Sequence, residues 1–261
     1  MDAHSGWITL DGVVNMRDLG GLPTRDGGRI APRRLIRSDN LQDLSETDVR
    51  HLVTELGISD VIDLRSHTER TLTGPGPLTE TDLTHHHHSF LRDDVREVTA
   101  QEALAMPWVN TQHGADRSEE NYWAEHYLGY LAHRPDSVAG ALDVISRSTG
   151  GAVVHCAAGK DRTGTVVALA LAVAGVPDEV IIEDYTRTAE RIEQIIERLR
   201  DVEPYRAGLV GRSIDEQTPQ PETMERILSA LDARHGGAAG WLVEQGWDEG
   251  DLERLRVRLT V

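Results

Sequence analysis

The sequence predicts an α/β fold in which a central, mostly parallel sheet is flanked by helices. Two stretches predict it. In residues 33–64, short apolar runs that suit strands alternate with a segment of helical periodicity. In residues 151–174, an apolar run leads through a loop into a helix that is apolar on all sides. This alternation is typical of parallel strands joined by crossover helices.

The N-terminal part supplies the first elements. We expect a strand at 33–38 (RRLIRS), a helix at 44–57 (LSETDVRHLVTELG) and a buried strand at 59–64 (SDVIDL). Within the helical segment, Ser45 is placed to cap the helix, Asp48 occupies the capping-box position and Gly57 ends it. A further strand is expected at 83–90 (LTHHHHSF).

The middle of the chain is less regular, and we expect residues 90–135 to form a variable, lid-like insertion with helical content. From Glu119 onward, aromatic residues recur at spacings of three and four. This predicts a helix that packs on the core rather than an aromatic stripe that binds a ligand. A second helix is expected at 136–148. Since no linker or repeat divides the chain, residues 1–261 are expected to form a single domain.

The C-terminal half continues the pattern. Residues 151–156 (GAVVHC) predict a central strand, followed by a loop of six residues and a buried helix that starts near Thr163. Residues 177–201 begin with proline and acidic residues, as helix starts do, and predict one long helix. The tail from residue 221 onward predicts short helices that end at glycines.

Composition limits the function. The net charge of −17 argues against a general nucleic-acid binder and against adsorption to anionic membranes. The single cysteine excludes an intrachain disulfide and a multi-thiolate zinc site, and it fits a reducing compartment. Residues 1–12 (MDAHSGWITLDG) lack the basic stretch and apolar core of a secretory signal, and no apolar run approaches the roughly 20 residues of a membrane span. We therefore expect a cytoplasmic protein without integral membrane association, and signal-independent export stays open.

The segment HCAAGKDRTG at 155–164 carries the strongest chemical signal. Cys156 ends the predicted central strand, and in open α/β sheets sites form at the carboxyl ends of strands. The amides and dipole at the start of the following helix attract an anion and favour the thiolate form of a cysteine. Arg162 lies six positions after Cys156, so its planar fork is placed to bind two phosphate oxygens above the sulfur. This arrangement suits attack of sulfur on phosphorus, with Thr163 positioned to assist the thiolate as a leaving group.

Other interpretations of the segment explain it less well. A nucleotide P-loop needs glycine at position 154 and serine or threonine at position 161, where this chain has valine and aspartate. A buried structural cysteine accounts for neither the charges nor the glycines. The run His85–His88 alternates between the two faces of its strand, so at most two of these residues could share a metal. We expect neither a metal nor any other cofactor.

The segment resembles the phosphate loop of the atypical bacterial tyrosine/phosphoinositide phosphatases, a branch of the cysteine-dependent phosphatase superfamily. The resemblance extends to NMRDLGG (15–21), LIRSDNLQDLS (35–45), VIDLRSHTE (61–69) and GVPDEVIIEDY (175–185), and to PETMERIL near residue 221. It covers most of the chain apart from about 90–135, where relatives carry variable helices. It implies a cysteine-phosphatase-like fold.

The resemblance also implies roles for residues of the loop. Cys156 is the nucleophile, Arg162 the phosphate clamp and Lys160 a second cation suited to multiply phosphorylated substrates. The residues expected to bind phosphate are Ala157, Ala158, Gly159, Lys160, Asp161, Arg162 and Thr163. Asp161 is our preferred general acid because the branch carries an aspartate at this place. The alternative is Asp93, or its neighbour Asp94, in the loop after the strand at 83–90.

Several polar residues near this loop are expected to support it. Asp63 and Arg65 follow a strand beside the site and are expected to brace it, and His155 to support the loop by hydrogen bonding. Asn15, Arg17 and Asp18 are expected to form a structural polar network.

Together these features predict a phosphatase that acts on phosphotyrosine, with phosphoserine, phosphothreonine and phosphoinositides as further candidates, through a phosphocysteine intermediate. Its partners would be a phosphorylated protein or phosphoinositide, with inorganic phosphate held in the loop. A rhodanese-like sulfurtransferase and a non-catalytic phosphate-binding module are the alternatives, and retention of both Cys156 and Arg162 disfavours the second.

Overall fold

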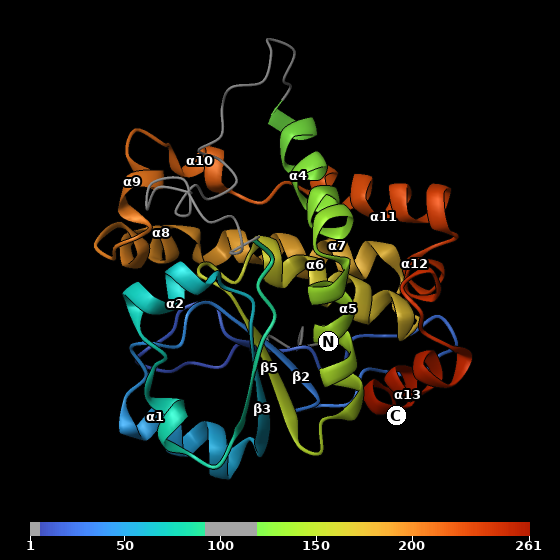
Figure 1. The fold of residues 1–261 in the computed structure, drawn as a ribbon, viewed down its shortest axis with the longest axis horizontal. Helices are drawn as coiled ribbons and strands as arrows, with labels where there is room; N and C mark the ends of the chain where they lie inside the picture. Colours follow the sequence, from blue (N-terminus) through green and yellow to red (C-terminus); the bar gives the residue numbers. More distant parts are fainter. Residues whose placement is uncertain (1–5, 92–118) are drawn as a thin grey trace.

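A computed structural model of the chain describes residues 6–91 and 119–261 (Figure 1). In this part of the chain a five-stranded sheet has the order β1-β2-β5-β3-β4. β2, β5, β3 and β4 are parallel, and β1 at the edge is antiparallel to β2. The predicted α/β fold with a mostly parallel sheet is confirmed. The strands are β1 (Arg17–Asp18), β2 (Leu35–Ser38), β3 (Ile58–Asp63), β4 (Thr84–His87) and β5 (Gly151–His155).

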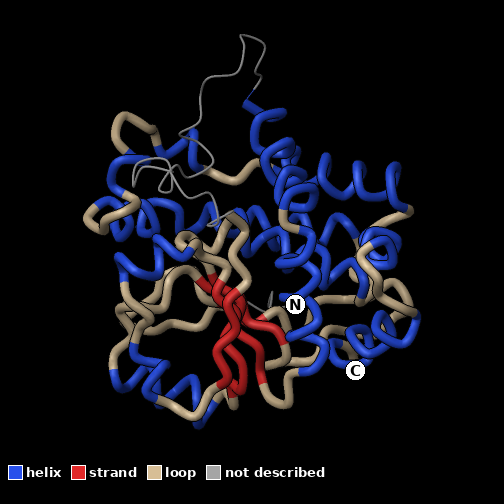
Figure 2. The backbone as a smooth tube through the Cα atoms, viewed as in Figure 1, coloured by secondary structure: helices blue, strands red, loops and turns tan. Residues whose placement is uncertain are grey.

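Helices surround the sheet, which lies at the centre of the molecule (Figure 2). A π-helical turn, η1 (His51–Glu55), extends α1, and two 3-10 turns are η2 (Pro77–Glu80) and η3 (Arg187–Arg191). The α-helices in the described residues are α1 (Glu46–Arg50), α2 (His67–Thr73), α4 (Glu119–His133), α5 (Pro135–Arg147), α6 (Asp161–Val173), α7 (Asp178–Thr186), α8 (Ile192–Arg200), α9 (Arg206–Leu209), α10 (Ile214–Gln217), α11 (Pro221–His235), α12 (Ala238–Glu244) and α13 (Glu249–Leu259).

The alternation of side chains along the strands divides the interior into two cores, one on each face of the sheet. On β5, Ala152 and Val154 enter the larger core, whereas Val153 enters the smaller one. The larger core is closed by α4 to α7 and by α11 to α13, and the smaller one by η1 and the N-terminal segment. The central strand is therefore buried on both faces, as a continuous apolar run predicts.

The strand register places three strand ends at the same level. Ser38 of β2 and Asp63 of β3 are both register partners of His155 on β5. The residues that follow these strands therefore share the carboxyl edge of the sheet, where Cys156 lies directly after His155.

The predicted strands and most of the predicted helices are confirmed. Ser45 caps α1, and Asp48 completes the capping box, as expected. The buried helix α6 begins at Asp161, two positions before the expected start, because an acidic residue occupies its first turn. As a result Arg162 belongs to the helix rather than to the loop.

The single long helix predicted for 177–201 is wrong, because the segment is divided into α7, η3 and α8. At the end of α7 and in η3, Asp184 and Thr188 accept hydrogen bonds from Arg17. In α8, by contrast, the isoleucines Ile192, Ile195 and Ile196 pack in a cluster with Ala157 and Ala158.

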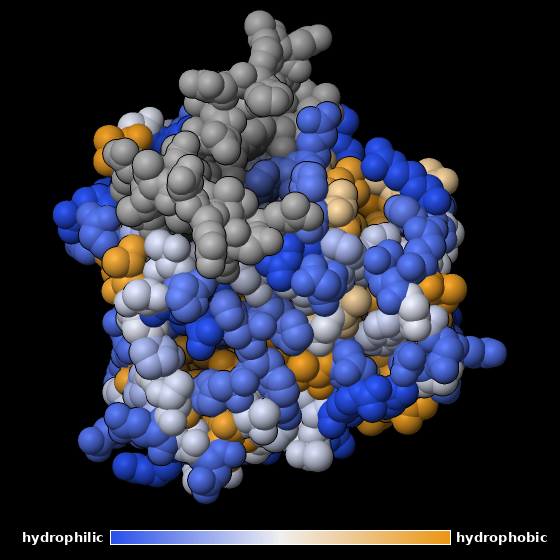
Figure 3. Space-filling view, in the orientation of Figure 1, coloured by the Kyte–Doolittle hydropathy of each residue, from blue (hydrophilic) through white to orange (hydrophobic). Residues whose placement is uncertain are grey.

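The surface seen in Figure 3 is largely hydrophilic, in keeping with the acidic composition. None of the described helices is long and apolar enough to cross a membrane. On β4, His86 is paired with Asp60, with 2.8 Å between Nε2 and Oδ1. His85 and His87 are hydrogen-bonded to the backbone carbonyls of Leu78 and Arg65. Within the described residues, no group of three or more His, Cys, Asp or Glu side chains could hold a metal ion.

Candidate active site

The loop between β5 and α6 begins with Cys156, of which 1% is exposed. Gly159 lets the loop pass close to the end of β2: its φ is +66°, and a Cβ there would lie 2.5 Å from the carbonyl oxygen of Ser38. No other residue type fits this position without displacing backbone. Gly164 packs closely against the ring of Tyr185, since a Cβ at this position would lie 3.3 Å from a ring carbon. Gly159 thus lets the loop pack against the end of β2, and Gly164 lets the first turn of α6 pack against α7.

Arg162 is bound bidentately by Glu69, a residue of α2. Its two terminal nitrogens donate to the two carboxylate oxygens at 2.6 and 2.8 Å, and both side chains are buried. Burial lowers the pKa of Arg162, but Glu69 and the nearby sulfur of Cys156 outweigh burial and hold the pKa well above its usual value. Burial raises the pKa of Glu69, and Arg162 more than offsets this, so that the carboxylate stays ionised. The fork therefore remains charged and oriented beside the thiol.

Sequence reasoning missed Glu69. It also completes the capping box of α2, since its carboxylate accepts from the amide of Ser66 at 2.7 Å. The pattern Ser66-x-x-Glu69 is a recognisable capping signal, but it predicts only the helix start. Nothing in the sequence indicates that the same carboxylate reaches a guanidinium 93 positions further along the chain.

Lys160 and Asp161 form a buried pair at the start of α6, with 2.9 Å between Nζ and Oδ1. The hydroxyl of Tyr127 on α4 donates to the same carboxylate oxygen, and the ammonium of Lys160 lies over the ring of Trp123, 4.4 Å from its centroid. Burial raises the pKa of Asp161, but Lys160 and then the Tyr127 hydroxyl outweigh burial and hold it below its ordinary value. In this state Asp161 is a carboxylate.

The aromatic residues of α4 pack in the core and also contact Lys160 and Asp161. Tyr127 and Tyr130 are buried in the larger core, which confirms the predicted packing. Tyr127 and Trp123 also contact Asp161 and Lys160, which periodicity could not show. His126 lies on the same helix and its pKa is lowered to about 4 by burial, so its imidazole is neutral at pH 7.

Asp63, Arg65 and His155 lie together at the carboxyl edge of the sheet. Arg65 donates to both oxygens of Asp63, at 2.9 and 2.6 Å, and His155 lies 3.8 Å from the same carboxylate. Burial raises the pKa of Asp63, but His155 and Arg65 outweigh it and lower the value overall. Burial lowers the pKa of His155 to about 4. Thr163 is fully buried, and its hydroxyl has no hydrogen-bond partner among residues 6–91 and 119–261.

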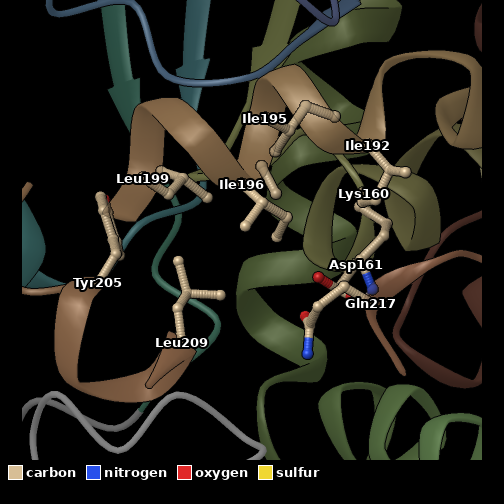
Figure 4. Close-up of a pocket in the computed structure, with 10 residues that line it drawn as sticks. Lys160, Asp161, Ile192, Ile195, Ile196, Leu199, Tyr205, Leu209 and Gln217 are labelled. Carbon is tan, nitrogen blue, oxygen red and sulfur yellow. The ribbon is translucent and has the colours of Figure 1, made fainter. Parts of the chain in front are cut away.

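A mostly apolar pocket opens beside the loop (Figure 4). Lys160 and Asp161 lie at one end of it, Tyr205 and Leu209 at the other, and isoleucines of α8 line the pocket between them (Figure 4). Tyr205 is almost fully buried there, and its hydroxyl has no partner in the described part of the chain. The residues that line the pocket are Ala158, Lys160, Asp161, Ile192, Ile195, Ile196, Leu199, Tyr205, Leu209 and Gln217.

Asp18 lies elsewhere than the sequence predicts. Asn15 and Arg17 do lie in a buried polar network, but Asp18 does not join it, because its carboxylate accepts from the amides of Gly20 and Arg33 instead. Asp18 closes a turn at the edge of the sheet. Asp93 and Asp94, like residues 92–118 of the predicted lid, lie outside the described residues.

Comparison with known proteins agrees with this geometry. Residues 8–261 match the family described as "Tyrosine phosphatase family". The chain belongs to this family. It is 29% identical to the "Triple specificity protein phosphatase PtpB" of Mycobacterium tuberculosis, over 95% of this chain and 96% of the relative. It is 27% identical to a "Tyrosine-protein phosphatase" of Nostoc commune, over 99% of this chain and 83% of the relative.

A solved structure, that of P. aeruginosa TpbA, aligns with this chain at 14% identity and a TM-score of 0.32, over 81% of this chain and 93% of the other. Membership of the tyrosine phosphatase family makes the chain a cysteine-dependent phosphatase, a phosphoric monoester hydrolase. The sulfurtransferase and the non-catalytic binding module, which the sequence left open, are thereby disfavoured.

Proposed function

We propose that this phosphatase hydrolyses phosphotyrosine through a phosphocysteine intermediate on Cys156. One observation carries the proposal: the same strand–loop–helix segment holds the buried thiol of Cys156 and the guanidinium of Arg162. Glu69 orients this guanidinium bidentately, and it lies close enough to the sulfur of Cys156 for the two to interact electrostatically. A planar cationic fork beside a nucleophilic sulfur is suited to a phosphoryl group and its three equatorial oxygens.

The proposed reaction has two steps. In the first, the thiolate of Cys156 attacks phosphorus, a sulfur–phosphorus bond forms, and the ester oxygen leaves with a proton from a general acid. In the second, a water molecule gives a proton back to the same group and attacks phosphorus, so that phosphate departs and the thiolate is restored. Thr163 follows Arg162 with a buried hydroxyl available to the sulfur as it leaves.

Asp161 is the general acid that we propose, with Asp93 as the alternative. In the substrate-free structure the Lys160 ammonium and the Tyr127 hydroxyl keep Asp161 ionised. A bound phosphate dianion adds negative charge nearby and competes for Lys160. Both effects raise the pKa of Asp161 toward the value that a proton donor needs.

Charge and shape support particular substrates. The apolar wall of α8 and α9 beside the loop suits the ring of a phosphotyrosine, and Lys160 is placed for a second phosphate, as phosphoinositides or doubly phosphorylated peptides carry. Phosphoserine and phosphothreonine lack a ring to fill the pocket. The net charge of −17 makes an anionic bilayer an unfavourable partner. We therefore propose phosphopeptides as the preferred class, with inorganic phosphate held in the loop after turnover.

We propose that the enzyme works in the cytoplasm, where a reducing environment keeps its single thiol active. Detection of the activity in the soluble lysate of washed source cells rather than in the culture medium is the expected result, and the reverse distribution would contradict it.

The test compares phosphate release from a phosphotyrosine peptide and from a short-chain phosphoinositide, with wild type, Cys156→Ser and Lys160→Met. We expect wild type to release phosphate from the peptide and Cys156→Ser to release none while still binding phosphate. Lys160→Met should lose more activity toward the phosphoinositide than toward the peptide. Turnover by Cys156→Ser would overturn the phosphocysteine route.

A further inference from the structure

Three consecutive carbonyl groups of the phosphate loop are held from outside by the N-terminal part of the chain. The backbone amide of Asn40 donates to the carbonyl oxygen of Ala157 at 3.0 Å. The side-chain amide of Asn15 donates to that of Ala158 at 2.8 Å. A terminal nitrogen of Arg37 donates to that of Gly159 at 2.7 Å.

These bonds determine the direction of the loop amides. In a planar trans peptide, the C=O of one residue and the N–H of the next point in opposite directions. Carbonyls that face outward, toward residues 15–40, therefore turn the N–H groups of Ala158, Gly159 and Lys160 toward the opposite side. In the part of the chain that the structure describes, these three amides have no acceptor. Successive amides that point into one concavity, with Gly159 at a positive φ, form an anion-binding nest.

A single buried carboxylate orients two of the three holding groups. Asp184 on α7 accepts from Arg17 at 2.8 Å and from Arg37 at 2.5 Å. Arg17 in turn donates to the side-chain oxygen of Asn15 at 2.7 Å. Because that oxygen is occupied by a donor, the NH₂ group of Asn15 must face the carbonyl of Ala158. All four of these side chains are buried.

We propose that Asn15 and Arg37 are positioning residues of the phosphatase, which turn the amides of Gly159 and Lys160 toward the phosphoryl group, and that Asp184 orients both. The inference rests on the proposed function. Neither side chain touches the substrate, since each acts through a peptide plane. Loss of one preorganised donor to a developing oxyanion typically lowers kcat by about 10²–10³-fold.

The main test is Asn15→Asp, which keeps the size of the side chain and an acceptor for Arg17 but offers the carbonyl of Ala158 no donor. We expect kcat toward an aryl phosphate to fall by about 10²-fold and the Kd of inorganic phosphate to rise by at least tenfold. The pair Arg37→Lys and Arg37→Met adds a rescue. Lysine keeps a donor for Gly159 and should retain phosphate affinity within about threefold, whereas methionine should lose it as Asn15→Asp does.

Arg25→Lys is the matched control, because Arg25 forms an exposed ion pair with Asp178 far from the loop. All variants are assayed well below their unfolding temperatures. A purely structural role predicts lower unfolding temperatures with unchanged kcat and phosphate affinity in the folded enzyme, and that result would overturn the proposal. If Asn15→Asp does not fold, the two Arg37 variants provide the test. Equal losses of phosphate affinity in Arg37→Lys and Arg37→Met would also contradict the proposal. A wild type that binds phosphate without hydrolysing esters would count against the proposed function alone.

Discussion

Replacing Glu69 with glutamine tests how Arg162, the proposed phosphate clamp, is held. The carboxylate accepts three hydrogen bonds, from Ser66 at 2.7 Å and from the two terminal nitrogens of Arg162 at 2.6 and 2.8 Å. Glutamine keeps one oxygen, which can still serve Ser66 and one nitrogen of Arg162. The other position becomes an NH₂ group that faces the second nitrogen of Arg162, donor against donor.

The expected cost follows from burial, since the two side chains are only 1% and 4% exposed. Leaving a buried charge without its partner costs about 3–5 kcal/mol. Because part of the hydrogen bonding survives, we expect Glu69→Gln to lower the free energy of unfolding by about 3 kcal/mol in the absence of phosphate. A misoriented fork should also lower kcat by about 10–100-fold.

Phosphate should partly restore this variant, because it supplies the negative partner that Arg162 has lost. The assay is denaturant unfolding with and without saturating phosphate. The gain in stability on adding phosphate should be larger for Glu69→Gln than for wild type by about 1 kcal/mol or more. Glu253→Gln, which removes an exposed ion pair with Arg256, is the matched control and should behave as wild type. Equal stabilisation of Glu69→Gln and wild type by phosphate, or a loss of stability no larger than that of the control, would refute the reasoning.

Three further predictions concern protons. Burial holds the pKa of His155 at about 4, against 6.5 for an exposed histidine, so the unfolded chain binds more protons between these values. His155 should therefore lower the free energy of unfolding by about 3 kcal/mol as the pH drops from 6.5 to 4. Denaturant unfolding of His155→Gln should lack this contribution and keep that of His126, whose pKa is also lowered to about 4. Although burial raises the pKa of Asp184, Arg17 and Arg37 outweigh it and lower the value from 3.8 to about 2. The ionised carboxylate of Asp184 should stabilise the fold above about pH 4, and the free energy of unfolding should fall by about 2 kcal/mol as the pH falls through 2. The variant Asp184→Asn should not show this fall. Tyr127→Phe removes a donor to ionised Asp161 and so raises its pKa, which should shift the alkaline limb of the kcat profile to higher pH. An unmoved limb would assign the proton to another group.

The fold could be predicted from local patterns because its elements carry local signals. The strand at 151–155 is a continuous apolar run, and the caps at Ser45 and Asp48 lie three positions apart. The long helix at 177–201 could not be seen to divide, because its break depends on Arg17 and on the cluster around Ala157, both distant in sequence.

In the site, too, some residues could be predicted from local sequence patterns and others could not. Cys156, Arg162 and the glycines lie within one short segment, so their spacing alone indicates an anion site. Glu69 of α2 and Tyr127 of α4 contact that segment directly, whereas Asp184 of α7 reaches it only through Arg37, and only the folded chain shows these contacts. An acidic residue on a polar helix face gives no sign that it is a buried partner of a guanidinium.

The most direct test of the central claim is rapid acid quenching of wild type during turnover of a phosphotyrosine peptide, followed by mass spectrometry of the peptide that contains Cys156. We expect the mass of one added phosphoryl group on Cys156, formed in a burst before steady state and absent from Cys156→Ser. Turnover without that adduct, or an adduct on any other residue, would contradict the claim.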